Sequence, residues 1–118
     1  MTAITQATPV AVRTALASGE ILLVDVREPN EYALERIAGA LLYPLSTFDP
    51  RAVPAEGRKI VVHCAAGRRS MQAAQQLVEA GHASVINLDG GLAAWKSAGL
   101  PLIRLDPATG QVMDPGRI

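Results

Sequence analysis

The chain has 118 residues, with 11 lysines and arginines against 11 aspartates and glutamates, so its formal net charge is zero. This length is enough for one domain with a hydrophobic core but not for two. The balanced charge disfavours nucleic acid and anionic membranes as partners, because both attract proteins with an excess of positive charge. No apolar run approaches the length needed to cross a bilayer, and the N-terminus does not resemble a secretory signal.

Short apolar runs alternate with helical patterns along the chain. The sequence predicts strands at 3–5, 21–26, 40–45, 60–64 and 84–88. Between and after them it predicts helices at 9–19, 28–37, 70–81 and 91–99. The runs at 21–26 and 60–64 are almost continuously apolar, which is typical of parallel strands covered on both faces. Thr8 before Pro9 is a typical helix start.

Strands that alternate with helices predict an α/β fold, with a mainly parallel central sheet of about five strands and helices on both faces. We expect a single domain over residues 1–103. The remaining residues, 104–118, are polar and rich in turn formers, and the sequence predicts no regular structure for them. This tail could be mobile, pack on the domain or mediate self-association.

Cys64 is the only cysteine, and it lies at the carboxyl end of a predicted central strand. Open α/β sheets bind their ligands at this end. The small residues after Cys64 allow the loop to curl so that several backbone N–H groups point at one atom, close to a helix N-terminus. Such a setting lowers a thiol pKa from about 8.5 into the range of about 3.5 to 7.5, so we expect a nucleophilic thiolate.

A lone cysteine in a small domain is more often an inert, buried apolar residue. The residues after Cys64 argue against that interpretation, because an inert core cysteine needs neither a glycine at the third position after it nor arginines at the fourth and fifth. One cysteine cannot form an internal disulfide, and this favours a reducing, cytoplasmic location.

The loop HCAAGRRS, residues 63–70, resembles the C-x-x-G-x-R-S active-site loop of single-domain rhodaneses, the thiosulfate sulfurtransferase family. Three further stretches match that family in the same order: LLVDVREPNEY, ERIAGALLYPL and NLDGGLAAWKSAGLP. The resemblance covers residues 4–102 approximately. One departure is Arg36, which stands where the family often has histidine, and it affects no atom with an expected catalytic role.

The resemblance implies a sulfurtransferase in which Cys64 attacks the sulfane sulfur of a small anionic donor such as thiosulfate and becomes a persulfide. A thiophilic acceptor, either cyanide or a cellular thiol, then removes that sulfur. A protein donor or acceptor is also possible. The chemistry requires no metal or organic cofactor, and the chain has only two histidines and no second cysteine to hold one.

The resemblance also assigns the substrate-binding loop, whose members are Ala65, Ala66, Gly67, Arg68, Arg69 and Ser70. We expect the two arginines to recognise the anionic end of the donor and Ser70 to cap the following helix. Asp25 and Arg27 end a neighbouring strand at the same edge of the sheet. They either support the site by hydrogen bonds or stabilise the fold.

Two other functions remain open from the sequence. The first is a persulfide carrier that exchanges sulfur with a partner protein. The second is a phosphatase or arsenate reductase of the same fold, but those enzymes place arginine six residues after the cysteine, where this chain has Ser70. The shorter loop favours a single sulfur atom over a tetrahedral oxyanion at its centre.

Overall fold

A five-stranded parallel sheet forms the centre of the protein, which is described here by a computed structural model covering residues 3–115. The strand order is β1-β6-β5-β2-β4, and all four neighbouring pairs run parallel. The strands are β1 (Ile4–Ala7), β2 (Ile21–Asp25), β4 (Leu41–Leu42), β5 (Lys59–His63) and β6 (Val85–Leu88). The structure confirms the five predicted strands and places β1 at an edge.

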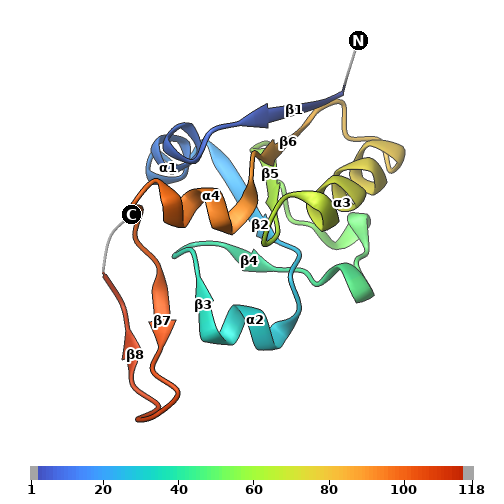
Figure 1. Cartoon of the computed structure of the whole chain (residues 1–118). Coiled ribbons are helices and arrows are strands. Elements are labelled where there is room, and N and C mark those ends of the chain that lie inside the picture. Colours follow the sequence, from blue (N-terminus) through green and yellow to red (C-terminus); the bar gives the residue numbers. More distant parts are fainter. Residues whose placement is uncertain (1–2, 116–118) are drawn as a thin grey trace.

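Helices cover both faces of this sheet (Figure 1), as the sequence predicted. They are α1 (Pro9–Ala17), α2 (Pro29–Leu34), α3 (Arg68–Glu79) and α4 (Gly91–Ser97), and two short 3₁₀ turns cover Leu45–Thr47 and Pro50–Ala52. Thr8 caps α1 by accepting the N–H of Ala11 at 3.2 Å, which confirms the predicted helix start.

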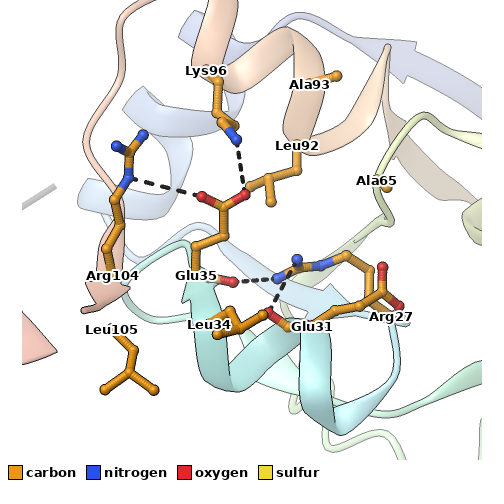
Figure 2. Close-up of a pocket in the computed structure, with 10 residues that line it drawn as sticks. All are labelled: Arg27, Glu31, Leu34, Glu35, Ala65, Leu92, Ala93, Lys96, Arg104 and Leu105. Carbon is orange, nitrogen blue, oxygen red and sulfur yellow. Dashed lines mark hydrogen bonds and ion pairs between the residues drawn. The ribbon is translucent and has the colours of Figure 1, made fainter. Parts of the chain in front are cut away.

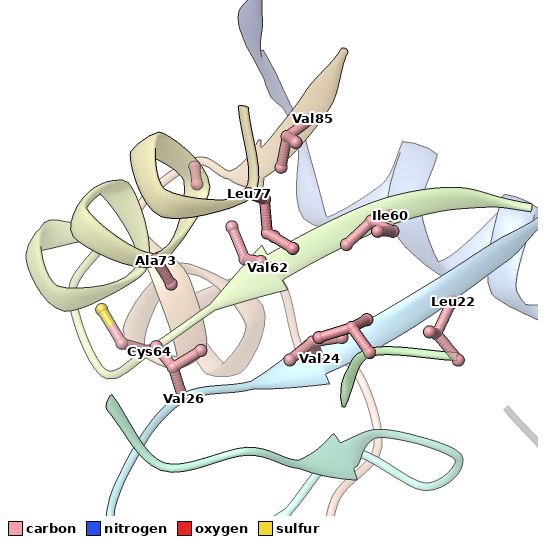
Figure 3. Packing of buried hydrophobic residues seen from close by; sticks show 11 residues of the cluster. Leu22, Val24, Val26, Ile60, Val62, Cys64, Ala73, Leu77 and Val85 are labelled. Carbon is pink, nitrogen blue, oxygen red and sulfur yellow. The ribbon is translucent and has the colours of Figure 1, made fainter. Parts of the chain in front are cut away.

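Each face of the sheet has its own apolar core. On one face, alternate residues of β2 and β5 pack against α3, and Cys64 lies at the end of this row beside Val26 and Ala73 (Figure 3). On the other face, Leu23 and Val61 pack with Trp95 of α4 and with residues of α1. Trp95 is fully buried, and its indole N–H donates to the Pro101 carbonyl at 2.9 Å.

A second, three-stranded sheet differs from the sequence predictions. It has the order β3-β7-β8 and consists of β3 (Glu35–Arg36), β7 (Ile103–Leu105) and β8 (Val112–Met113). The expected helix at 28–37 therefore ends at Leu34, because Glu35 and Arg36 pair antiparallel with β7. Figure 2 shows Glu35 of β3 beside Arg104 of β7.

The tail beyond residue 103 is thus regular in part, where the sequence predicted no regular structure. The chain reverses between β7 and β8 in a turn where the N–H of Gly110 bonds the Asp106 carbonyl at 2.7 Å. A boundary between domain and tail at residue 103 stays a prediction. Residues 1–2 of the expected domain and 116–118 of the expected tail lie outside the described residues. Within residues 3–115, no helix is long and apolar enough to cross a membrane.

Candidate active site

Cys64 follows β5 directly and begins the loop that leads into α3. This loop lies at the carboxyl edge of the parallel sheet, as the sequence predicted. The helix begins earlier than expected, at Arg68, because Gly67 adopts a left-handed conformation with φ of 107° and is the N-cap. Ser70 therefore lies inside the first turn and does not cap α3, which corrects the expected role.

The Cys64 thiol lies at the centre of converging hydrogen-bond donors. The Gly67 N–H donates to Sγ at 3.0 Å, and the Ser70 hydroxyl lies 3.4 Å from it. Burial by itself would raise the pKa of this thiol, but hydrogen bonds from the Ser70 hydroxyl and from the N–H groups of Ser70, Gly67 and Ala66 outweigh burial and lower it. A lowered thiol pKa is what the loop sequence predicted.

The first residues of α4 hold the other side of this loop. The Leu92 N–H donates to the Cys64 carbonyl at 2.9 Å, and the Ala93 N–H donates to the Ala65 carbonyl at 3.0 Å. Gly91 makes this approach possible. A Cβ at Gly91 would lie 2.6 Å from the Cys64 carbonyl oxygen and 2.8 Å from the Ala65 carbonyl group. With their carbonyls turned toward α4, the loop residues present their N–H groups to the sulfur.

The two arginines of the loop differ in their surroundings. Arg69 forms a bidentate ion pair with Glu31 of α2, at 2.6 and 3.0 Å. Arg68 is exposed and has no carboxylate within 4 Å among the described residues. Arg69 thus links the start of α3 to α2, while Arg68 remains available for a ligand.

Glu31→Gln tests how much this ion pair stabilises the protein. The arginine holds the pKa of Glu31 at about 2, below its usual 4.5, chiefly through side-chain hydrogen bonds. Because the folded-state pKa is lowered, the stabilisation is complete above pH 4.5 and is lost as the pH falls toward 2. Both side chains are about one-third exposed, so we expect the variant to lose only about 1 kcal/mol at pH 7.

Denaturant unfolding at pH 7 and pH 3 measures that loss, and glutamine retains the oxygen that accepts the Glu28 N–H. We expect the gap between wild type and variant to narrow at pH 3. Arg69→Gln and the double variant complete a cycle that isolates the pairwise energy. A coupling energy near zero at pH 7 would contradict a stabilising role.

Asp25 and Arg27 form a buried ion pair at 2.8 Å behind the loop. Arg27 also donates to the Glu35 carbonyl at 2.7 Å, which ties β2 to the end of α2. Neither side chain contacts Cys64 in the hydrogen bonds of residues 3–115. His63 lies between this pair and the loop. Its Nδ1 is 3.2 Å from the Cys64 carbonyl oxygen, while its Nε2, 3.4 Å from Asp25, has no hydrogen-bond partner among residues 3–115.

His63 points to the sheet face opposite Cys64, because side chains alternate along a strand. It is fully buried, and burial lowers its pKa, so the ring is neutral at pH 7. Its position behind the sheet, with Nδ1 at the Cys64 carbonyl, fits a structural role and not that of a general base at the sulfur.

Two hollows adjoin the loop. One, of about 320 Å³, borders Ala66, Gly67 and Arg68 and is completed mainly by Gln6 and Asn87. Asn87 is 3 % exposed, and its Oδ1 has no hydrogen-bond partner among residues 3–115. The other, of about 510 Å³, borders Ala65 and extends toward α2, α4 and β7. No group of three or more metal-ligating side chains occurs within the described part of the chain.

Sequence reasoning missed three contributors to this site: Glu31, the N–H groups of Leu92 and Ala93, and Asn87. The first-turn position of Glu31 was visible, but its partner 38 residues away was not. The Gly90-Gly91 pair is typical of a tight turn, but it does not indicate that the turn packs against the loop. Nothing in the sequence around Asn87 distinguished it from an ordinary strand residue.

The family model described as "Rhodanese-like domain" matches residues 8–98. Because this match spans well over half of the chain, the protein belongs to the rhodanese family, and the structure shows the α/β fold expected of it.

Relatives and a solved structure agree with this assignment. Uncharacterized protein slr1261 of Synechocystis is 46 % identical over 94 residues, which cover 79 % of this chain but 52 % of that protein, so the chain spans about half of its length. Thiosulfate sulfurtransferase GlpE of Coxiella burnetii is 35 % identical over 66 % of this chain and 74 % of its own. The solution structure of the rhodanese-like domain of Anabaena Alr3790 superposes with a TM-score of 0.75 at 30 % identity, covering 96 % of this chain and 89 % of that one.

Proposed function

We propose that this protein is a sulfurtransferase that moves a sulfane sulfur from a small anionic donor, such as thiosulfate, to a thiophilic acceptor through a persulfide on Cys64. The observation that carries the proposal is the Cys64 Sγ at the centre of the loop, bonded by the Gly67 N–H at 3.0 Å and with a lowered pKa. The similarity to a protein named thiosulfate sulfurtransferase supports thiosulfate as the first donor to test.

The reaction has two balanced steps. The Cys64 thiolate attacks the outer sulfur of thiosulfate, a new S–S bond forms, and sulfite leaves with the electron pair of the broken S–S bond. An acceptor nucleophile, cyanide or a thiolate, then attacks the terminal persulfide sulfur, and the Cys64 thiolate is the leaving group. The N–H groups of the loop stabilise the anionic sulfur in both steps, without metal or organic cofactor.

In this proposal the residues of the loop have separate tasks. Arg68, free of a carboxylate partner among the described residues, binds the sulfonate end of the donor. Ala65, Ala66 and Gly67 line the approach, and the Ser70 hydroxyl lies 3.4 Å from the sulfur. Arg69 keeps α3 and the loop in place through Glu31. Asp25 and Arg27 support the fold behind the loop as a buried ion pair.

The same persulfide would serve a carrier that exchanges sulfur with a partner protein. The rate of reaction with small donors distinguishes an enzyme from such a carrier. Phosphatase or arsenate reductase activity is disfavoured, since Cys64 is 1 % exposed in a short loop that suits one terminal sulfur atom better than a tetrahedral oxyanion. The cytoplasmic location expected from the single cysteine stays a prediction.

The experiment that tests the proposal is intact-mass spectrometry of the protein before and after thiosulfate, and again after cyanide. We expect a gain of one sulfur atom and its removal by cyanide with release of thiocyanate. Persulfide formation slower than about one turnover per minute would favour the carrier, a threshold set well below typical enzyme rates. A protein that gains no sulfur from thiosulfate would contradict the proposed donor.

A further inference from the structure

The hollow of about 510 Å³ beside Ala65 has a composition that a small inorganic donor does not require (Figure 2). Its walls come from α2, α4 and β7. Leu34, Leu92 and Leu105 give it an apolar lining, and the Leu34 side chain is 50 % exposed there. The volume lies within the range of about 300 to 1,000 Å³ that is typical of sites for organic molecules. Thiosulfate is far smaller and has no apolar part.

Among the described residues, the charges around the hollow leave one positive charge in excess. Arg27 is paired with Asp25 at 2.8 Å, and Glu31 is paired with Arg69 at 2.6 Å. The two remaining cations, Lys96 and Arg104, share a single carboxylate.

That carboxylate is Glu35, which lies 2.9 Å from Lys96 Nζ and 3.8 Å from Arg104 Nε. Within residues 3–115 neither cation has a second acidic partner within 4 Å. A ligand that fits this hollow therefore combines an apolar body with one anionic group.

The position of the hollow connects it to the proposed chemistry. Ala65 directly follows the nucleophile, and its carbonyl is held by the N–H of Ala93, another residue of the lining. Arg104 and Leu105, which close the far side, lie outside the segment 8–98 that the family model matches. This wall is thus supplied by the tail and is not part of the matched domain.

Resting on the proposed function, we propose that this hollow binds the sulfur acceptor, and that the acceptor is an organic thiol with an apolar chain and a carboxylate. The carboxylate binds at Lys96 and Arg104, the chain lies on the leucine side chains, and the thiol reaches the loop at Ala65. The thiolate attacks the terminal sulfur of the Cys64 persulfide. The new S–S bond leaves sulfur on the acceptor, and the broken one returns the Cys64 thiolate.

A matched pair of probes tests the carboxylate requirement. Protein loaded with sulfur and freed of thiosulfate is mixed with 6-mercaptohexanoate or with 6-mercaptohexanol, and loss of the persulfide is followed by mass. We expect the acid to react faster than the alcohol by roughly threefold to tenfold, the scale of one partly exposed charge interaction. The ratio of the two rates within one variant cancels general damage to the loop.

Substitutions in the hollow should change this ratio in both directions. Lys96→Gln with Arg104→Gln reverses the local charge, so the preference for the acid should vanish or invert. Glu35→Gln removes the carboxylate that pairs with both cations, so the preference should rise. Lys59→Gln removes one positive charge at a distance, from an exposed lysine at the other end of β5, and should leave the ratio at its wild-type value.

Three outcomes would overturn the inference. The ratio of the acid rate to the alcohol rate could be the same in the wild type and in the variants of Lys96, Arg104 and Glu35. It could also change as much in Lys59→Gln as in those variants. Alternatively, the variants of Lys96, Arg104 and Glu35 could change the rate of persulfide formation from thiosulfate, which would assign the hollow to the donor. A wild-type protein that forms no persulfide with thiosulfate would instead refute the proposed function, and the inference with it.

Discussion

We expect Cys64→Ser to abolish measurable sulfur transfer. The rate should fall by a factor on the order of 10⁶, the scale expected when a covalent nucleophile is removed. The hydroxyl of serine is not ionised by the N–H groups that lower the pKa of the Cys64 thiol. The variant should gain no sulfur from thiosulfate in intact-mass spectra and release no thiocyanate with cyanide.

The control for this prediction is the stability of the Cys64→Ser variant. Serine is close to cysteine in size and can accept the Gly67 N–H, so the free energy of unfolding should change by no more than about 1–2 kcal/mol. Thermal unfolding measures this change. A well-folded Cys64→Ser protein that still transferred sulfur at a substantial fraction of the wild-type rate would rule out the persulfide mechanism.

The central architecture was predictable because its signals are local. The runs that became β2 and β5 are buried on both faces, and continuous apolar residues are the direct trace of that burial. The position of Cys64 followed from the order of the elements, since parallel strands bring their carboxyl ends to one edge. The pair Thr8-Pro9 likewise predicted the start of α1, because the cap and the first helical residue are adjacent in sequence.

The parts that the sequence did not predict depend on partners far away in the chain. Glu35 and Arg36 are acceptable helix formers, and they become a strand only because β7, nearly 70 residues later, offers hydrogen bonds to them. The same pairing gives structure to a tail whose composition alone favours turns. The Glu31–Arg69 pair joins two helices in the same way, so no local pattern could reveal it.

The packing of Gly91 against the loop gives the second prediction. Gly91→Ala should lower the free energy of unfolding by about 2–4 kcal/mol, because it combines a left-handed φ of 59° with a clash against backbone atoms. The carbonyls of Cys64 and Ala65 cannot move aside without turning the N–H groups away from the sulfur. We therefore expect persulfide formation to slow by about 100-fold, the usual effect of a displacement near 1 Å.

Gly99→Ala is the matched control at the other end of α4. Its φ is 73°, and a Cβ there would meet nothing within 4 Å, so it shares the conformational cost without the clash. This variant should lose about 1 kcal/mol and keep wild-type rates of persulfide formation. Equal losses of rate in the two variants would show that helix strain, and not the contact with the loop, limits the reaction. A larger loss in Gly91→Ala alone would establish that α4 shapes the loop that holds the Cys64 thiolate.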